Sequence, residues 1–160
     1  MRVFAYILPL LFFAQPAAVE DSKKVVKLEK ETRNLAKKKT PVDRTKTYVK
    51  IADIQLDLAG DAAKREDFEV MQRRISEYCA SIGDAHRTMA ESGRDPVRKP
   101  AGFKDLEIAI RRHSRALEDI GSLLAFEQRE FVQKTIQQIT DIRDQLMKGL
   151  FPRKEAPSRV

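Results

Sequence analysis

The sequence contains a single cysteine, Cys79, two histidines and no tryptophan in 160 residues. One cysteine cannot form an intrachain disulfide, so burial of apolar side chains must stabilise the fold. Cys79 follows Tyr78 in an apolar helical stripe, and we expect a buried structural thiol rather than a reactive or intermolecular one. His86 and His113 fall on different predicted helices, and neither belongs to the Glu-x-x-His motif of helical di-iron proteins. We therefore expect no metal site and no bound cofactor.

Short catalytic motifs are also missing. The sequence has no glycine-rich phosphate loop, no serine nucleophile elbow and no Cys–His pairing of known spacing. His113 occupies an inward position of an apolar stripe, which favours a satisfied imidazole at the edge of the core over a ligand or a pH switch. We expect no catalytic residues.

Two pairs of carboxylates have the one-turn spacing of an acid–base or cation site, namely Asp53 with Asp57 and Asp141 with Asp144. Nearby cations favour surface salt bridges instead. The cations expected to neutralise these pairs are Lys50, Arg143 and Lys148.

The longest apolar run lies at the N-terminus, where Arg2 is followed by Val3–Ala14 and then by the small residues Ala17 and Ala18. A run of about 12 residues fits a signal peptide and is shorter than the ~20 residues that span a bilayer. Residues 1–18 therefore predict export to the periplasm or the outside. The run is not followed by the cysteine of a lipoprotein, and a weak cleavage site leaves an uncleaved anchor open. No later segment is apolar enough to span a membrane.

Positive charge is concentrated at the two ends of the chain. Residues 20–40 carry eight lysines or arginines against four acids, and residues 152–160 carry three against one. Residues 41–151 carry nineteen of each sign. This distribution is typical of basic, solvated or partner-binding ends on a neutral body.

Hydrophobic spacing predicts an all-α protein, because apolar residues recur three and four apart and no stretch alternates with a period of two. We interpret residues 41–151 as an antiparallel four-helix bundle made of two helical hairpins, 42–91 and 103–150, joined by a loop over 92–102. A charged helix within 19–40 precedes the bundle, and residues 152–160 form a basic flexible tail. Thr40 and Pro41 predict a fresh helix start.

In the second hairpin, the turn near 126–129 is predicted from a shift of the apolar stripe around Glu127 and Gln128, because the segment contains no glycine or proline. A single helix over 103–150 is the competing interpretation. The charged N-terminal helix is equally open, since its thin stripe of Val25, Leu28 and Leu35 could pack on its own bundle or on another protein.

The charged helix carries the larger of two basic clusters. Its cations could meet an anionic membrane surface or an acidic polymer, although a solvated helix that only maintains solubility is the simpler interpretation. Export and the lack of an aromatic residue in this segment argue against nucleic acid as a partner. The cluster comprises Lys23, Lys24, Lys27, Lys30, Arg33, Lys37, Lys38 and Lys39.

A second basic patch, Arg111, Arg112 and Arg115, lies on the fourth predicted helix. Acidic residues are close in sequence, so we interpret these arginines first as ion-paired surface residues and second as a docking face.

Together these patterns lead to a hypothesis about function class only. We expect an exported, non-catalytic helical protein that binds or scaffolds an unidentified protein in the cell envelope. The alternative is a periplasmic binder of an anionic surface through the basic helix. An enzyme with an unrecognised site is a distant third.

Overall fold

A computed structural model describes residues 21–152 of the chain and shows five α-helices. No strand occurs among these residues, which confirms the all-α expectation. None of their helices combines the length and hydrophobicity needed to cross a bilayer. The signal peptide predicted in residues 1–18 and most of the predicted tail lie outside the described residues. The helices are α1 (Ser22–Leu35), α2 (Pro41–Lys64), α3 (Phe68–Ala90), α4 (Phe103–Ser122) and α5 (Phe126–Leu150).

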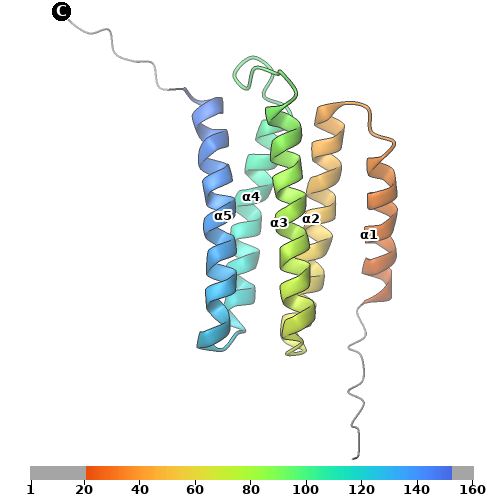
Figure 1. The fold of residues 1–160 in the computed structure, drawn as a ribbon, viewed down its shortest axis with the longest axis vertical. Coiled ribbons are helices and arrows are strands. Elements are labelled where there is room, and N and C mark those ends of the chain that lie inside the picture. The colour runs from red at the N-terminus through yellow and green to blue at the C-terminus, as the bar shows by residue number, and fades with distance from the viewer. Residues whose placement is uncertain (1–20, 153–160) are drawn as a thin grey trace, which may run out of the picture.

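The helices stand side by side and alternate in direction along the chain (Figure 1). Helix α2 packs most extensively on α3, and α4 packs most extensively on α5. Contacts of α2 with α4 and of α3 with α5 join these two pairs, whereas α1 packs against α2 alone. Helix α2 therefore has neighbours on several sides and is the central element of the structure.

The start of α2 follows the sequence signals closely. Thr40 is the N-cap, its hydroxyl oxygen accepts a hydrogen bond from the Asp43 backbone N–H at 3.1 Å, and Pro41 opens the helix. Pro41 costs nothing there because the first backbone N–H groups of a helix have no intrahelical acceptor. The Thr40 hydroxyl also donates to the Asp43 carboxylate. These contacts stop α1 and α2 from merging into one helix.

The core is formed by the stripes that the spacing predicted. In α3, every large apolar member of the stripe between Met71 and Met89 is fully buried. Tyr78 lies at its centre, and its ring meets the ring of His113 edge to face, with centroids 5.3 Å apart. The α3 members are Met71, Ile75, Tyr78, Ile82, Ala85 and Met89.

Residues 103–150 form two helices rather than one. The turn occupies Leu123 to Ala125, slightly before the 126–129 segment that the sequence indicated. Leu124 is buried there, and its carbonyl oxygen accepts a hydrogen bond from Arg129 Nε at 2.9 Å. A buried leucine and a side-chain donor thus terminate α4 without glycine or proline.

Helix α1 packs on its own chain, which answers the question left open by its thin stripe. Val25, Leu28 and Leu35 are half-buried, and α1 has no fully buried residue. Helix α2 offers a second apolar face, whose members are nearly fully buried yet lie outside the main core cluster: Ile51, Ile54 and Leu58. Because α1 contacts only α2, we infer that α1 covers this second face.

Candidate functional site

The outer side of α1 carries a row of lysines. Lys23, Lys27 and Lys30 are spaced four and three residues apart, which places them on one face of the helix. Helical geometry sets this face opposite Val25 and Leu28, which turn toward α2. All three lysines are exposed and make no ion pair with another described residue. We call them the outer lysine row.

Lys24 differs from the rest of the basic cluster because it binds within the protein. Its ammonium group pairs with the carboxylate of Asp61 on α2. The hydrogen bond to Asp61 is the main cause of its raised pKa; burial opposes it, and the charges of Asp61, Asp57 and Asp21 add to it. Lys24 therefore fastens α1 to α2 and does not belong to the outer surface.

The other members of the basic cluster are exposed but lie outside the outer lysine row. Arg33 lies in the last turn of α1 and lines a hollow between α1, α2 and α3. Lys37, Lys38 and Lys39 lie beyond the end of α1, in the connection to α2. The structure therefore divides the basic cluster by position. Some members form the outer lysine row, Lys24 binds α2, and the remaining members lie at or beyond the end of α1.

The second basic patch is partly ion-paired. Arg111 lies 3.8 Å from the carboxylate of Glu107, and Arg112 lies 2.5 Å from Asp53. Arg115 is exposed and makes no ion pair among residues 21–152. Two of the three arginines therefore match the first interpretation of this patch.

Asp53, Arg112 and His113 form a cluster that the sequence reasoning missed. Asp53 Oδ1 lies 2.6 Å from His113 Nε2, and His113 is only 2% exposed. The partner assigned to the Asp53–Asp57 pair, Lys50, is not the cation that binds Asp53. Periodicity placed His113 inward. It did not show that α2 lies opposite His113, because Asp53 is 60 residues away in the sequence.

The partner expected for Asp141 and Asp144 is also different. Arg143 Nε binds the carboxylate of Glu107 on α4 at 3.0 Å, so it joins α4 to α5. Asp141 accepts a hydrogen bond from the Gln137 amide at 2.8 Å. Asp144 and Lys148 make no ion pair within the described part of the chain.

The histidine cluster runs from the core to the surface: His113 is buried, Asp53 is partly exposed and Arg112 is exposed. Burial raises the pKa of Asp53, but hydrogen bonds and charges from His113 and then Arg112 outweigh it and leave the pKa lowered. An ionised carboxylate only accepts hydrogen bonds, so His113 Nε2 donates to it. His113 Nδ1 and the Tyr78 hydroxyl are buried without a partner among the described residues. Burial also raises the pKa of Tyr78.

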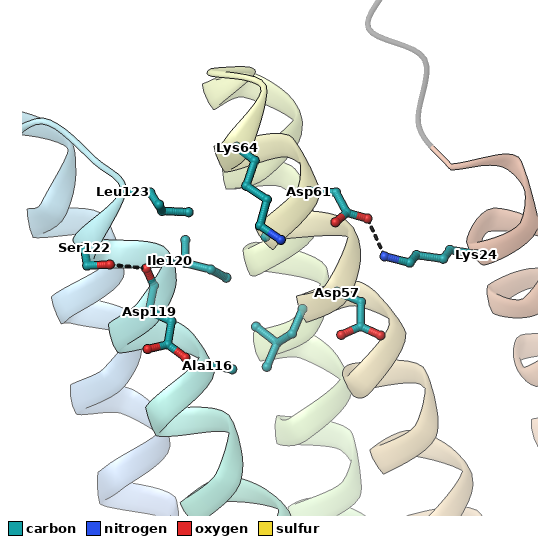
Figure 2. Close-up of a pocket in the computed structure, with 11 residues that line it drawn as sticks. Lys24, Asp57, Asp61, Lys64, Ala116, Asp119, Ile120, Ser122 and Leu123 are labelled. Carbon is teal, nitrogen blue, oxygen red and sulfur yellow. Dashed lines mark hydrogen bonds and ion pairs between the residues drawn. The ribbon is translucent and has the colours of Figure 1, made fainter.

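A groove runs along α2 and α4 beside this cluster, with a volume of about 570 Å³. Figure 2 shows α4, α2 and α1 in a row, with the Lys64 ammonium group directed into the space between α2 and α4. Leu56, Ala116 and Ile120 supply apolar lining, and Asp57, Asp61 and Asp119 supply carboxylates. A smaller hollow that includes Asp53 and His113 shares Leu56, Asp57 and Ala116 with the groove.

Among residues 21–152, no group of three or more His, Cys, Asp or Glu side chains is arranged to hold a metal ion. Comparison of the chain with protein-family models, curated proteins and solved structures finds no match.

Proposed function

We propose that this chain is an exported, non-catalytic binding protein of the cell envelope that contacts an anionic surface through the outer lysine row of α1. In this interpretation α2 to α5 form an antiparallel four-helix bundle that serves as the scaffold, and α1 is the added contact helix. The observation that carries the proposal is the division of α1 into two faces. Its apolar side packs on α2, and Lys23, Lys27 and Lys30 point away from the rest of the protein.

The division of α1 sets the mode of contact. Because Val25 and Leu28 pack on α2, they are not available for insertion among lipid chains. Each lysine of the row contributes about 1 kcal/mol near an anionic membrane surface. Val26, which is 60% exposed, is the one large apolar side chain that the described α1 leaves exposed, and a single valine adds little insertion to this charge contact. Such binding is weak and weakens further as salt rises.

The test compares two triple variants of the purified protein. One replaces Lys23, Lys27 and Lys30 with glutamine, and the control replaces three exposed lysines elsewhere, Lys99, Lys134 and Lys148. Both variants lose the same net charge. Binding to vesicles rich in phosphatidylglycerol, and to a soluble polyphosphate, is measured by co-sedimentation at low and moderate salt.

We expect the α1 variant to lose about a hundredfold in vesicle affinity, because three contacts of about 1 kcal/mol are removed. The control variant should retain most of the binding. Equal losses in the two variants would mean that only net charge matters and would remove the assignment to α1. A preference for polyphosphate over vesicles would identify an acidic polymer as the target.

A protein partner for the scaffold is the second candidate, and the exposed Arg115 and the α2–α4 groove are the observations that favour it. A partner captured equally by both triple variants would support it. Deleting α1 is a poor test, because it would expose Ile51, Ile54 and Leu58. The resulting hydrophobic patch would bind other proteins non-specifically.

A further inference from the structure

One edge of α2 separates its charges by sign. Between Lys46 and Asp61, the lysines come first and the aspartates follow. Spacings of four, three, four and four residues keep all of them on one side of the helix. Along the chain, the edge reads Lys46, Lys50, Asp53, Asp57 and Asp61. Asp43 before this span and Lys64 after it lie on the same side of α2 with the reverse order of sign.

The members of this edge differ in how far they are already paired. Lys46 lies 3.8 Å from Asp105, Asp53 binds Arg112 and His113, and Asp61 binds Lys24. Lys50 and Asp57 are exposed and make no ion pair with another described residue. Asp57 acts on Lys24 only through its charge at a distance.

Such an edge is complementary to itself when it is turned end for end. If two α2 helices lie antiparallel across a two-fold axis, Lys50 of each copy faces Asp57 of the other. In the same register, Lys46 of each copy faces Asp61 of the other. A two-fold interface repeats every contact, so each ion pair forms twice.

We propose that the face formed by α2 and α4 binds a second copy of this chain in an antiparallel two-fold arrangement. Lys50 and Asp57 are the reciprocal ion pair that sets its register. This proposal does not depend on the proposed function, because the outer lysine row lies on α1 and this face is formed by α2 and α4.

The surroundings of the edge allow this approach. Lys50 and Asp57 are exposed, and among the described helices α2 contacts α1, α3 and α4, so this edge is open between α1 and α4. At the end of α2 drawn in Figure 2, α4, α2 and α1 lie in a row. Residue pairs such as Lys46 with Asp105 and Asp53 with Arg112 show that α2 and α4 run parallel in register. The α2–α4 face therefore extends as one strip along both helices.

Apolar groups on the same face supply contact area. Leu123, which directly follows the last residue of α4, lines the groove and is 52% exposed, and Ile108 in the first half of α4 is 51% exposed. In an antiparallel pair, Ile108 and Leu123 of one copy lie over opposite ends of the α2–α4 face of the other copy. The groove, with its lining of Leu56, Ala116 and Ile120, lies between the two helices and can receive side chains from the second copy.

The test uses charge reversal and sedimentation equilibrium. The single variants Lys50→Glu and Asp57→Lys each turn two attractive pairs into two repulsive ones. We expect each to weaken self-association roughly tenfold, given typical energies of surface ion pairs. Mixing the two variants restores attraction at both pairs. In the mixed dimer the glutamate introduced at position 50 faces the lysine introduced at position 57, and the unaltered Asp57 faces the unaltered Lys50.

The mixture should therefore associate like the unaltered protein, and so should the double variant K50E/D57K. Matched controls are Asp144→Lys and Lys148→Glu on α5, which carry the same charge changes away from this face. They should leave association unchanged, and circular dichroism verifies that every variant is folded. A protein that stays monomeric at low salt, or a mixture no tighter than the single variants, would overturn the proposal.

Discussion

Asp53 on α2 and His113 on α4 are joined by a hydrogen bond, with 2.6 Å between Oδ1 and Nε2, although 60 residues separate them in the chain. The imidazole is buried, whereas the carboxylate is partly exposed at the edge of the α2–α4 face. This contact links the first helical pair to the second. Two ion pairs, Lys46 with Asp105 and Asp53 with Arg112, also join α2 and α4.

Replacing Asp53 with alanine should destabilise the protein by about 1–3 kcal/mol, because the buried His113 then loses its acceptor. The matched variant is Asp57→Ala, one turn along the same helix, where no ion pair within the described part of the chain is broken. Urea unfolding at neutral pH measures both. Similar losses in the two variants would show that the Asp53–His113 contact has no special role.

Acid should reduce the difference in unfolding free energy between the unaltered protein and the Asp53→Ala variant. The pKa of Asp53 lies below its usual 3.8 in the folded state, because its hydrogen bonds and charges outweigh the effect of burial. A lowered carboxyl pKa contributes stability above the unfolded pKa, and that stability is lost as pH falls through the folded pKa. We expect the difference in unfolding free energy to persist at neutral pH and to shrink below about pH 4. A difference independent of pH would contradict this.

Gly102 and Gly83 should respond in opposite ways to replacement by alanine. Gly102 has a φ of +87°, and an added Cβ would lie 2.6 Å from Met89 Sδ, so Gly102→Ala should be destabilising. Gly83 lies inside α3, and an added Cβ would meet nothing within 4 Å. Gly83→Ala should therefore raise stability by about 0.5–1 kcal/mol. Thermal melts of the two variants should shift in opposite directions.

Backbone amides of α1 should exchange with solvent faster than those of α3. Helix α1 has no buried residue and one neighbouring helix, whereas the stripe of α3 is completely buried. Regions with few buried contacts open at lower free energy. Hydrogen–deuterium exchange read by mass spectrometry provides the comparison. Equal protection of the two helices would mean that the Lys24 tether and the second face of α2 hold α1 as firmly as the core.

Cys79 should react slowly with a thiol reagent at neutral pH. Burial raises the pKa of this thiol, and a hydrogen bond with Thr135 only partly opposes the effect. The thiolate is the reactive form, so its small population limits the rate. We expect the reaction to be roughly tenfold or more faster in urea, where the thiol is released from the fold. A similar rate in both conditions would contradict this account of Cys79.

The helices were predictable because their signals are local. Thr40 and Pro41 separate α1 from α2, and the stripe from Met71 to Met89 identifies the buried side of α3. The exception is the α4–α5 turn, where no glycine or proline marks the end of the helix. There the buried Leu124 and its contact with Arg129 determine the break, and both depend on tertiary structure.

Contacts between helices were less predictable. Periodicity shows which residues turn inward, but it does not show which helix lies opposite. The sequence therefore placed His113 at an inward position without its partner Asp53. The spacing of α2 likewise does not show that Ile51 and Leu58 lie outside the main core cluster. In the structure these two residues belong to a second face that α1 covers.

The topology also bears on the order in which the chain folds. Helices α2 and α3 are consecutive and have the most extensive contact, so little chain entropy is lost when they meet. The parallel alignment of α2 with α4 requires closure of a loop that includes all of α3 and the connection after it. Contacts between residues distant in sequence slow folding. We therefore expect docking of α4 on α2, completed when His113 reaches Asp53, to limit the folding rate.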